Sequence, residues 1–303
     1  MVRLSVLASL LLSLVVPSSA TSAPLAKEIE VDGVRLSYVE EGAGEPIVFV
    51  HGAFSDLRVW EPVVREEVAR RYRFIAYTQR YHGLGAWKGD GKEYNTVTHA
   101  DDLAKFITSL NAGPVHLVGY SGGGAVAMVA ALKNPALVRT LTMYEPAALF
   151  VLPAESAERK AAREDNAKWA SAAREANKAG DPVRTMRLFI EGVLQLEPGG
   201  FDRLSEPTQT MLLDNARTAP LMFGAPPAPA ITCDELKTFT RPTLVTQGEK
   251  TQTFFKLINE GISKCVPGVQ QVSFPDLDHG APSAAPAAFT AALFEFLARH
   301  QGL

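Results

Sequence analysis

Short apolar runs alternate with longer helical patterns along most of this chain, and that alternation restricts the possible folds more than any other feature. Continuous apolar runs such as 47–50 and 115–118 are typical of strands that are covered on both faces. Segments with helical character lie between such runs, for example 96–110, 122–134 and 286–300. Strands alternating with helices predict an α/β fold with a mostly parallel, eight-stranded sheet and helices on both faces.

The alternation stops between Pro146 and Arg241, where no convincing strand is found. Helical patterns fill this stretch instead, at 154–178, 182–196 and 203–218. A structureless loop of that length is improbable in a folded domain, so a helical insertion over the sheet is expected. The predicted organisation is a core formed by residues 27–146 and 241–303, with residues 147–240 inserted as a helical cap.

The first twenty residues have the pattern of a secretory signal peptide. Arg3 provides a positive start, residues 4–16 are uncharged and rich in Leu and Val, and Ser18-Ser19-Ala20 matches a small-residue cleavage site. Cleavage as late as residue 26 is also compatible with the sequence. We expect a periplasmic or secreted protein with no stable membrane association after removal of the signal; the alternative is an uncleaved N-terminal anchor.

Charge and histidine content exclude several classes of function. The chain of 303 residues carries 30 Lys and Arg against 33 Asp and Glu, without a basic stripe, so a nucleic acid is not an expected partner. Its six histidines show no spacing typical of metal ligands, and no metal or organic cofactor is predicted. The expected partner is a small-molecule substrate, and the sequence leaves the oligomeric state open.

The chain has two cysteines, Cys233 and Cys265. An oxidising compartment permits disulfides. Cys233 precedes a predicted strand at 243–247, and Cys265 ends the helical pattern that follows this strand. Both residues could therefore meet at one edge of the core. A structural disulfide and a pair of buried thiols remain equally open at this point.

A Gly-x-Ser-x-Gly pattern places a candidate nucleophile between a strand and a helix. The segment Gly119-Tyr120-Ser121-Gly122-Gly123 directly follows the apolar run 115–118 and precedes an Ala-rich helical segment. Such a turn holds the serine in a strained, exposed conformation. The N–H of Gly122 at the helix start is a candidate donor to an oxyanion, and Ala53, in the loop after residues 47–50, is the candidate second donor.

Together these motifs resemble the α/β-hydrolase superfamily. The strand followed by His51-Gly52, the serine motif, the helical insertion and the late Asp278-His279-Gly280 occur in that family's order. The resemblance implies a serine hydrolase with Ser121 as nucleophile and His279 as base. His279 is also the one histidine in a loop just after a late strand, on the sheet edge where Ser121 is expected.

The acid departs from the pattern of most family members, which place an Asp after the seventh strand. Thr251 stands at that position here, and threonine cannot carry the charge that stabilises an imidazolium. A minority of relatives place the acid after the sixth strand, where this chain has Glu145. We therefore predict an exported Ser-Glu-His variant with Glu145 as the acid. Glu249, Asp276 and Asp278 are the alternative candidates for the acid.

These roles predict hydrolysis of carboxylic esters or lactones through an acyl-enzyme. Phe54, Tyr120 and Tyr144 are the candidate substrate-binding residues, and their lining suits a small to medium, moderately apolar substrate. An acyltransferase, a C–C hydrolase or a lyase on the same scaffold is an alternative. A further alternative is an exported binding protein without turnover, which the absence of an Asp at residue 251 favours.

Overall fold

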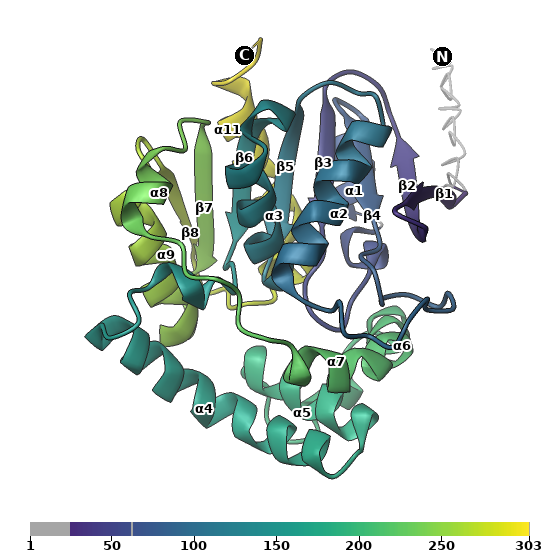
Figure 1. The fold of residues 1–303 in the computed structure, drawn as a ribbon, viewed down its shortest axis with the longest axis vertical. Helices are drawn as coiled ribbons and strands as arrows, with labels where there is room; N and C mark the ends of the chain where they lie inside the picture. The colour runs from purple at the N-terminus through teal and green to yellow at the C-terminus, as the bar shows by residue number, and fades with distance from the viewer. Residues whose placement is uncertain (1–24, 62, 303) are drawn as a thin grey trace, which may run out of the picture.

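A computed structural model describes residues 25–61 and 63–302. The predicted signal peptide at residues 1–20 lies outside the described residues. Eight strands form one sheet in the order β1-β2-β4-β3-β5-β6-β7-β8 (Figure 1). The strands are β1 Lys27–Val31, β2 Val34–Glu41, β3 Pro46–Val50, β4 Arg73–Tyr77, β5 Val115–Tyr120, β6 Val138–Tyr144, β7 Thr243–Gly248 and β8 Gln270–Phe274. The predicted fold class is confirmed.

The sheet is antiparallel at one edge and parallel elsewhere. β1 and β2 form a hairpin around Asp32 and Gly33, which both have positive φ, and β2 pairs antiparallel with β4. From β4 to β8 every pair is parallel. The carboxyl ends of the parallel strands therefore meet at one edge of the sheet, and loops after these strands can bring distant residues together.

Helices cover both faces of the sheet, as the continuous apolar strands require. In β3, Ile47 and Phe49 contact one apolar cluster, whereas Val48 and Val50 contact the other. One face is covered by α1 (Val63–Ala69) and α11 (Pro286–Ala298), and the other by α2 (Thr96–Ser109), α3 (Gly122–Lys133) and α9 (Thr253–Cys265). The short helix η1 (Leu57–Trp60) follows β3, η2 (Pro135–Leu137) precedes β6, and α10 (Ala281–Ala284) precedes α11.

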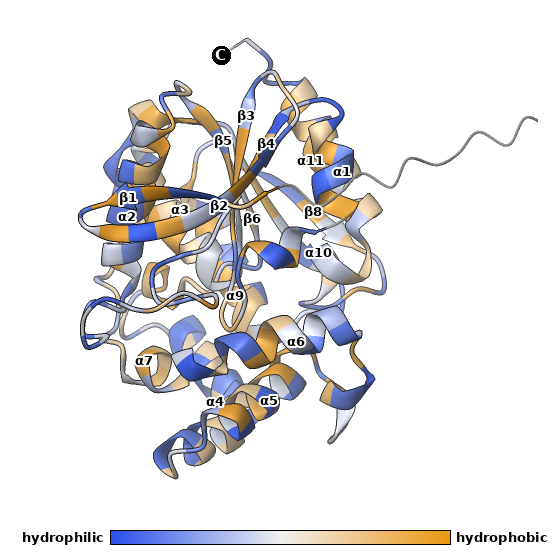
Figure 2. Cartoon of the chain, turned by 90° about the vertical axis from the view of Figure 1, so that its right-hand side faces the viewer, coloured by the Kyte–Doolittle hydropathy of each residue, from blue (hydrophilic) through white to orange (hydrophobic). Residues whose placement is uncertain are grey.

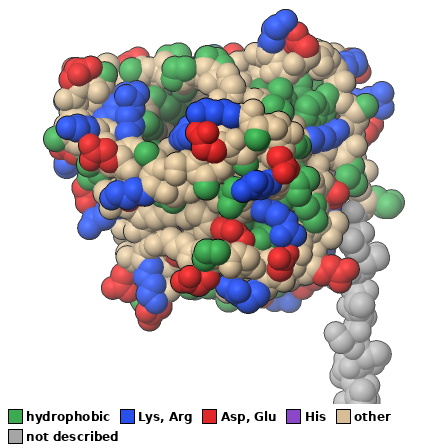
Figure 3. All heavy atoms as spheres, turned by 90° about the horizontal axis from the view of Figure 1, so that it is seen from below, with side chains coloured by type: hydrophobic (Ala, Val, Ile, Leu, Met, Phe, Trp, Pro, Cys, Tyr) green, Lys and Arg blue, Asp and Glu red, His purple; other side chains and the backbone are tan. Residues whose placement is uncertain are grey.

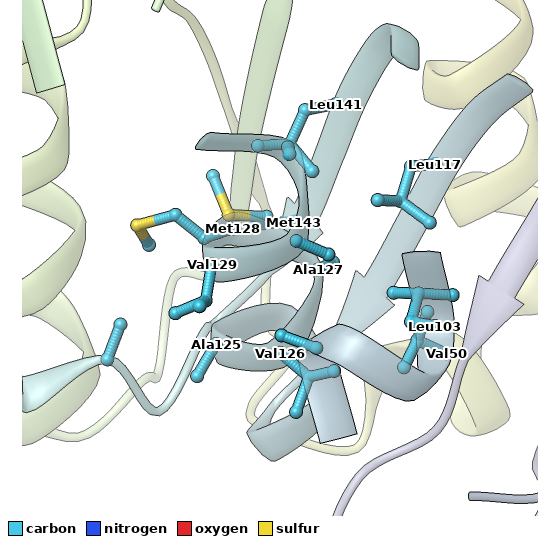
Figure 4. Close-up of a cluster of buried hydrophobic side chains, with 14 of the residues drawn as sticks. Val50, Leu103, Leu117, Ala125, Val126, Ala127, Met128, Val129, Leu141 and Met143 are labelled. Atoms are coloured by element: carbon cyan, nitrogen blue, oxygen red, sulfur yellow. The ribbon is translucent and has the colours of Figure 1, made fainter. Parts of the chain in front are cut away.

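Tight packing of α3 against the central strands fixes the segment that carries Ser121. Ala127 and Val126 of α3 belong to the same apolar cluster as Leu117 of β5 and Leu141 of β6, which Figure 4 shows. Small side chains on α3 allow the helix backbone to approach the sheet closely. The start of α3 is consequently held against the carboxyl end of β5.

The segment between β6 and β7 contains helices and no strand among residues 145–242, all of which are described. The helices are η3 Leu149–Val151, α4 Ala157–Lys178, α5 Pro182–Val193, η4 Gly200–Arg203, α6 Glu206–Asn215, η5 Ala216–Thr218, α7 Ala219–Gly224 and α8 Cys233–Lys237. Figure 2 shows α4, α5, α6 and α7 beneath the sheet, at the edge formed by the strand carboxyl ends. We call residues 147–240 the cap.

Polar bridges join the cap to the loops of the core. Asn215 is fully buried and donates to Asp56 Oδ2 (2.7 Å), while its Oδ1 accepts from the N–H of Gly83 (2.7 Å). Arg58 donates to Asp214 Oδ2 at 2.9 Å. Two core loops, one of them the loop that follows β3, are therefore held by the same cap segment.

Cys233 of α8 and Cys265 of α9 are joined in a disulfide with a sequence separation of 32 residues. The bridge ties the end of the cap to a core helix. Replacing both cysteines by serine should lower the free energy of unfolding by about 4 kcal/mol, because the unfolded chain then gains loop entropy. Urea unfolding of the variant and the parent checks this value. An unchanged unfolding midpoint in non-reducing buffer would contradict it.

Acidic and basic side chains are mixed over the face that is seen from below the cap, without a large area of one sign (Figure 3). Among the described helices, none has the length and apolar character needed to cross a bilayer.

Candidate active site

Ser121 lies at a sharp bend between β5 and α3, with φ 54° and ψ −121°. This left-handed conformation is strained for a residue with a side chain, and such strain concentrates at functional sites. Close packing makes the neighbouring glycines necessary. A Cβ on Gly119 would lie 2.6 Å from the carbonyl oxygen of Gly123, and one on Gly123 would lie 2.3 Å from the carbonyl oxygen of His51. The pattern of small residues around Ser121 follows from this packing.

The loop after β3 lies directly against the Ser121 bend. A Cβ on Gly52 would be only 3.0 Å from Ser121 Cβ, and one on Gly122 would be 3.8 Å from the backbone nitrogen of Ala53. The backbone nitrogens of Ala53 and Gly122 thus border the same space beside Ser121. Two N–H groups in such positions can bind an oxyanion.

His279 and Glu145 form a buried pair at the same sheet edge. His279 Nδ1 lies 2.6 Å from Glu145 Oε2, and Glu145 Oε1 accepts from the N–H of Gly248 at 2.8 Å. Glu145 is 0% exposed and has a positive φ of 41° directly after β6. Both carboxylate oxygens therefore have a fixed partner. A carboxylate in this position orients the imidazole and favours a proton on its Nδ1, leaving Nε2 free to accept one.

The other candidate carboxylates have different partners. Asp278 Oδ1 accepts from the N–H of Gly280 at 2.8 Å, and Glu249 Oε2 accepts from the N–H of Asp276 at 3.2 Å. Asp276 itself pairs with Lys250 at 3.0 Å. The structure thus brings Glu145 to His279 and directs these three carboxylates elsewhere. The hydroxyl of Thr251 is buried without a hydrogen-bond partner in the described chain.

Three aromatic residues hold the His279 loop. The ring of Phe255 stacks on the imidazole with centroids 4.1 Å apart at 15°. Tyr120 donates from its hydroxyl to the carbonyl oxygen of His279 at 3.0 Å, and Tyr144 donates to that of Asp278. Phe255 was not among the predicted site residues. Its position after β7, in an amphipathic helix, was the available signal.

A cavity of about 320 Å³ opens beside Ser121 and His279. We call it the aliphatic chamber, since most of its wall consists of aliphatic side chains from the cap. Ser121, His279, Tyr120 and Ala53 form its core side. The cap contributes Phe189, Ile190, Val193, Leu194, Leu196, Leu204, Met211 and Leu212.

A second cavity of about 400 Å³ also borders Ser121. We call it the histidine chamber. One wall is polar and consists of His51, Gln79, His82, Tyr94, Asn95, Thr96 and His99. The opposite wall is mainly aromatic and includes Trp169, Phe189, Phe223, Phe254 and Phe255. Gly122, Ala53 and Arg174 also line this chamber.

Tyr120 lines the aliphatic chamber, but the other two predicted substrate-binding residues do not line either chamber. Phe54 is fully buried and packs against Phe189 with ring centroids 5.2 Å apart. Tyr144 is also fully buried and supports the His279 loop through its hydroxyl. Phe54, in the loop after β3, and Tyr144, the last residue of β6, thus lie in the core and on neither chamber wall.

The histidines of the second chamber are buried in the uncharged form. Burial lowers the pKa of His51 to about 4 and the pKa of His99 to about 3. His51 Nε2 accepts from the N–H of Gln79 at 3.0 Å, and its Nδ1 donates to the carbonyl oxygen of Gly52 at 2.9 Å. His51 therefore braces the loop that carries Ala53. Within the described residues, no cluster of His, Cys, Asp and Glu has an arrangement suited to a metal ion.

These lowered pKa values make stability depend on pH. Well above pH 6.5, the pKa of histidine in the unfolded chain, His51 and His99 are neutral in both states, so they do not make stability depend on pH. As the pH falls toward 4, the unfolded chain binds protons that folded His51 and His99 do not, and stability is lost. The loss approaches about 1.4 kcal/mol per pH unit for each histidine.

Replacing His99 by Leu should remove one of the protons that the unfolded chain binds at acid pH and the folded chain does not. Nε2 of His99 has no hydrogen-bond partner in the described chain, so the apolar side chain leaves no partner unpaired. We expect the slope of unfolding free energy against pH, between about pH 6 and pH 4.5, to fall by about one proton. Urea titrations at several pH values measure it, and an identical slope in the variant would refute the assignment.

Comparisons with known proteins agree with this architecture. A family model described as "Alpha/beta hydrolase family" matches residues 47–293, and the chain belongs to this family. It is 29% identical over 283 residues to 2-(acetamidomethylene)succinate hydrolase of Mesorhizobium japonicum, an alignment that covers 90% of this chain and 95% of that protein.

A shorter alignment relates the chain to 2-hydroxy-6-oxo-2,4-heptadienoate hydrolase of Pseudomonas putida. The two are 30% identical over 131 residues, which is 40% of this chain and 45% of that protein, so less than half of that relative is matched. Among solved structures, a thermophilic esterase from Thermogutta terrifontis with malate bound superimposes with a TM-score of 0.68 at 25% identity, covering 91% of this chain and 100% of that chain.

Proposed function

We propose that the protein is a serine hydrolase that cleaves carboxylic esters through an acyl-enzyme on Ser121. The observation that carries this proposal is the 2.6 Å contact between Glu145 Oε2 and His279 Nδ1, on the chamber wall that also bears Ser121. A serine, an imidazole and a carboxylate at the strand carboxyl ends of one sheet are the groups that acyl transfer requires.

The proposed reaction has two stages. His279 Nε2 takes the Ser121 proton while Ser121 Oγ attacks the ester carbonyl, and the N–H groups of Ala53 and Gly122 bind the oxyanion. His279 then gives the proton to the leaving alcohol as the C–O bond breaks. Water, deprotonated by His279, hydrolyses the acyl-enzyme and regenerates Ser121.

The size and lining of the aliphatic chamber favour uncharged, moderately apolar groups next to the reacting carbonyl. Its volume of about 320 Å³ admits a short alkyl or small aromatic group. The chamber wall has no Lys or Arg among the described residues. A strongly anionic group would therefore lose its hydration there without gaining a cation.

A fluorophosphonate reagent followed by peptide mass spectrometry tests the proposal. We expect covalent labelling at Ser121 and hydrolysis of a panel of esters and lactones, with acid and alcohol as the products. An unlabelled Ser121 would support a binding protein without turnover and defeat the proposal. Carbon–carbon cleavage or acyl transfer as the main product would keep the nucleophile but reject ester hydrolysis.

We further propose that the protein acts outside the cytoplasm. The signal-like sequence at residues 1–20 and the Cys233–Cys265 disulfide support the same oxidising location. Fractionation of the natural host, with detection of the protein by antibody, tests this proposal. Recovery of a full-length chain from the cytoplasm with both thiols free would refute it.

A further inference from the structure

The two chambers meet at Ser121 but differ in which reacting groups they border. His279 lines the aliphatic chamber and is absent from the wall of the histidine chamber. Gly122, with its oxyanion-binding N–H, lines the histidine chamber and is absent from the other wall. Phe189 and Ala53 line both cavities, as Ser121 does.

This difference indicates which chamber would hold the alcohol part of an ester and which would hold the acyl part. His279 must reach the oxygen of the leaving alcohol to protonate it, so the alcohol has to lie on the His279 side. The aliphatic chamber is on that side. The acyl group, which remains attached to Ser121 after the alcohol has left, then extends into the histidine chamber.

The chambers also differ in charge. Asp278 is the one charged side chain on the described wall of the aliphatic chamber, and Arg174 of α4 is the one on the described wall of the histidine chamber. Arg174 forms no ion pair with a carboxylate in the described part of the chain; it bonds to Asn166 at 2.5 Å and lies 5.7 Å from the ring centroid of Phe223, and both of these partners are neutral. Its charge is therefore available to a ligand.

Neutral groups in the histidine chamber also favour a negatively charged ligand. Thr96, the first residue of the 14-residue helix α2, lines the chamber, and a helix N-terminus favours negative charge. Asn166 on the wall can also donate a hydrogen bond through its Nδ2, since its Oδ1 is the atom that bonds to Arg174. None of the described residues on this wall is an Asp or Glu. The chamber thus has donors and a cation but no competing anion.

We propose, building on the ester hydrolysis proposed above, that the substrate is the monoester of a dicarboxylic acid with an apolar alcohol. The alcohol occupies the aliphatic chamber, and the free carboxylate at the far end of the acyl group faces Arg174. Attack by Ser121 forms one C–O bond and breaks another, the released alcohol takes its proton from His279, and water then releases the dicarboxylate.

Three esters of matched size test the assignment. They are monobutyl adipate, the butyl ester in which an isopropyl group replaces the free carboxylate, and the reversed ester of the same formula, which has its carboxylate on the alcohol. We expect kcat/KM to be about tenfold higher for monobutyl adipate than for the butyl ester with the isopropyl group, called the isopropyl ester below. A factor of about ten corresponds to one charge-assisted hydrogen bond. The reversed ester should be the slowest, because it places the carboxylate beside Asp278.

Arg174→Met should lower the ratio of kcat/KM for monobutyl adipate to that for the isopropyl ester by about tenfold. Arg174→Lys should retain part of the preference, and the preference should weaken as salt is added. Arg163→Met is the matched control, since Arg163 is exposed on the same helix and lines neither chamber.

The possible failures are distinguishable. Equal rates for monobutyl adipate and the isopropyl ester, or faster cleavage of the reversed ester, overturn this inference while ester hydrolysis stands. A ratio that is the same in Arg174→Met and the parent enzyme also overturns it. If none of the three esters acylates Ser121, as judged by the mass of the quenched protein, the proposed function fails together with the inference.

Discussion

Replacing Glu145 by Gln is expected to lower kcat for ester hydrolysis by about 10⁴-fold while leaving KM nearly unchanged. The carboxylate contacts His279 Nδ1 at 2.6 Å and is 0% exposed, so water cannot take its place. An amide can turn its NH₂ toward Nδ1 and stabilise the tautomer with the proton on Nε2. That tautomer cannot accept the proton of Ser121.

The matched control for this experiment is Glu249→Gln. Glu249 follows the seventh strand, close to the usual position of the acid, but it contacts the N–H of Asp276. We expect its replacement to leave kcat within about twofold of the parent value, as for most surface substitutions. If Glu249→Gln lost activity and Glu145→Gln kept it, the acid would have been assigned to the wrong strand.

Ser121→Ala is expected to reduce kcat by about 10⁶-fold, because the variant has no oxygen to form the acyl-enzyme. The variant should also resist fluorophosphonate. Loss of the hydroxyl should not unfold the protein, since the backbone of residue 121 keeps its bonds to Tyr144 and Ala147. Thermal denaturation of the variant therefore checks that the lost activity is chemical.

Ser263→Ala serves as the control for Ser121→Ala. The hydroxyl of Ser263 is buried without a hydrogen-bond partner in the described chain, and the residue lines neither chamber. Its replacement should preserve both labelling and turnover. If Ser121→Ala had the same kcat as the parent, another group would have to perform the reaction. That result would refute the serine-hydrolase proposal.

Much of the fold could be predicted because the responsible signals are local. Apolar runs of strand length, the Gly119–Gly123 pattern and the long helical stretch before Arg241 each depend on neighbouring residues. The order of these elements then indicated which strand ends share an edge. The order of the strands therefore also predicts that Ser121, His279 and Glu145 lie at this edge, and the structure places them there.

The features missed from the sequence depend on packing between distant elements. Phe255 of α9 stacks on His279 in the loop after β8; the amphipathic pattern of α9 places Phe255 in the core but does not indicate this partner. Phe54 and Tyr144 have the aromatic character of a binding wall, yet their backbones turn them into the core. The histidine chamber combines residues from the loop after β4, the start of α2 and the cap. No contiguous sequence motif therefore predicts it.

The division between core and cap has a consequence for the evolution of this chain. Ser121, His279 and Glu145 follow core strands, whereas most of the aliphatic wall and Arg174 come from helices of the cap. Under the proposed function, substitutions on those helices would change which compounds are accepted without altering the proposed catalytic residues. Related proteins could thus diverge in substrate preference through changes in the cap helices while they keep the same residues at the strand ends of the core.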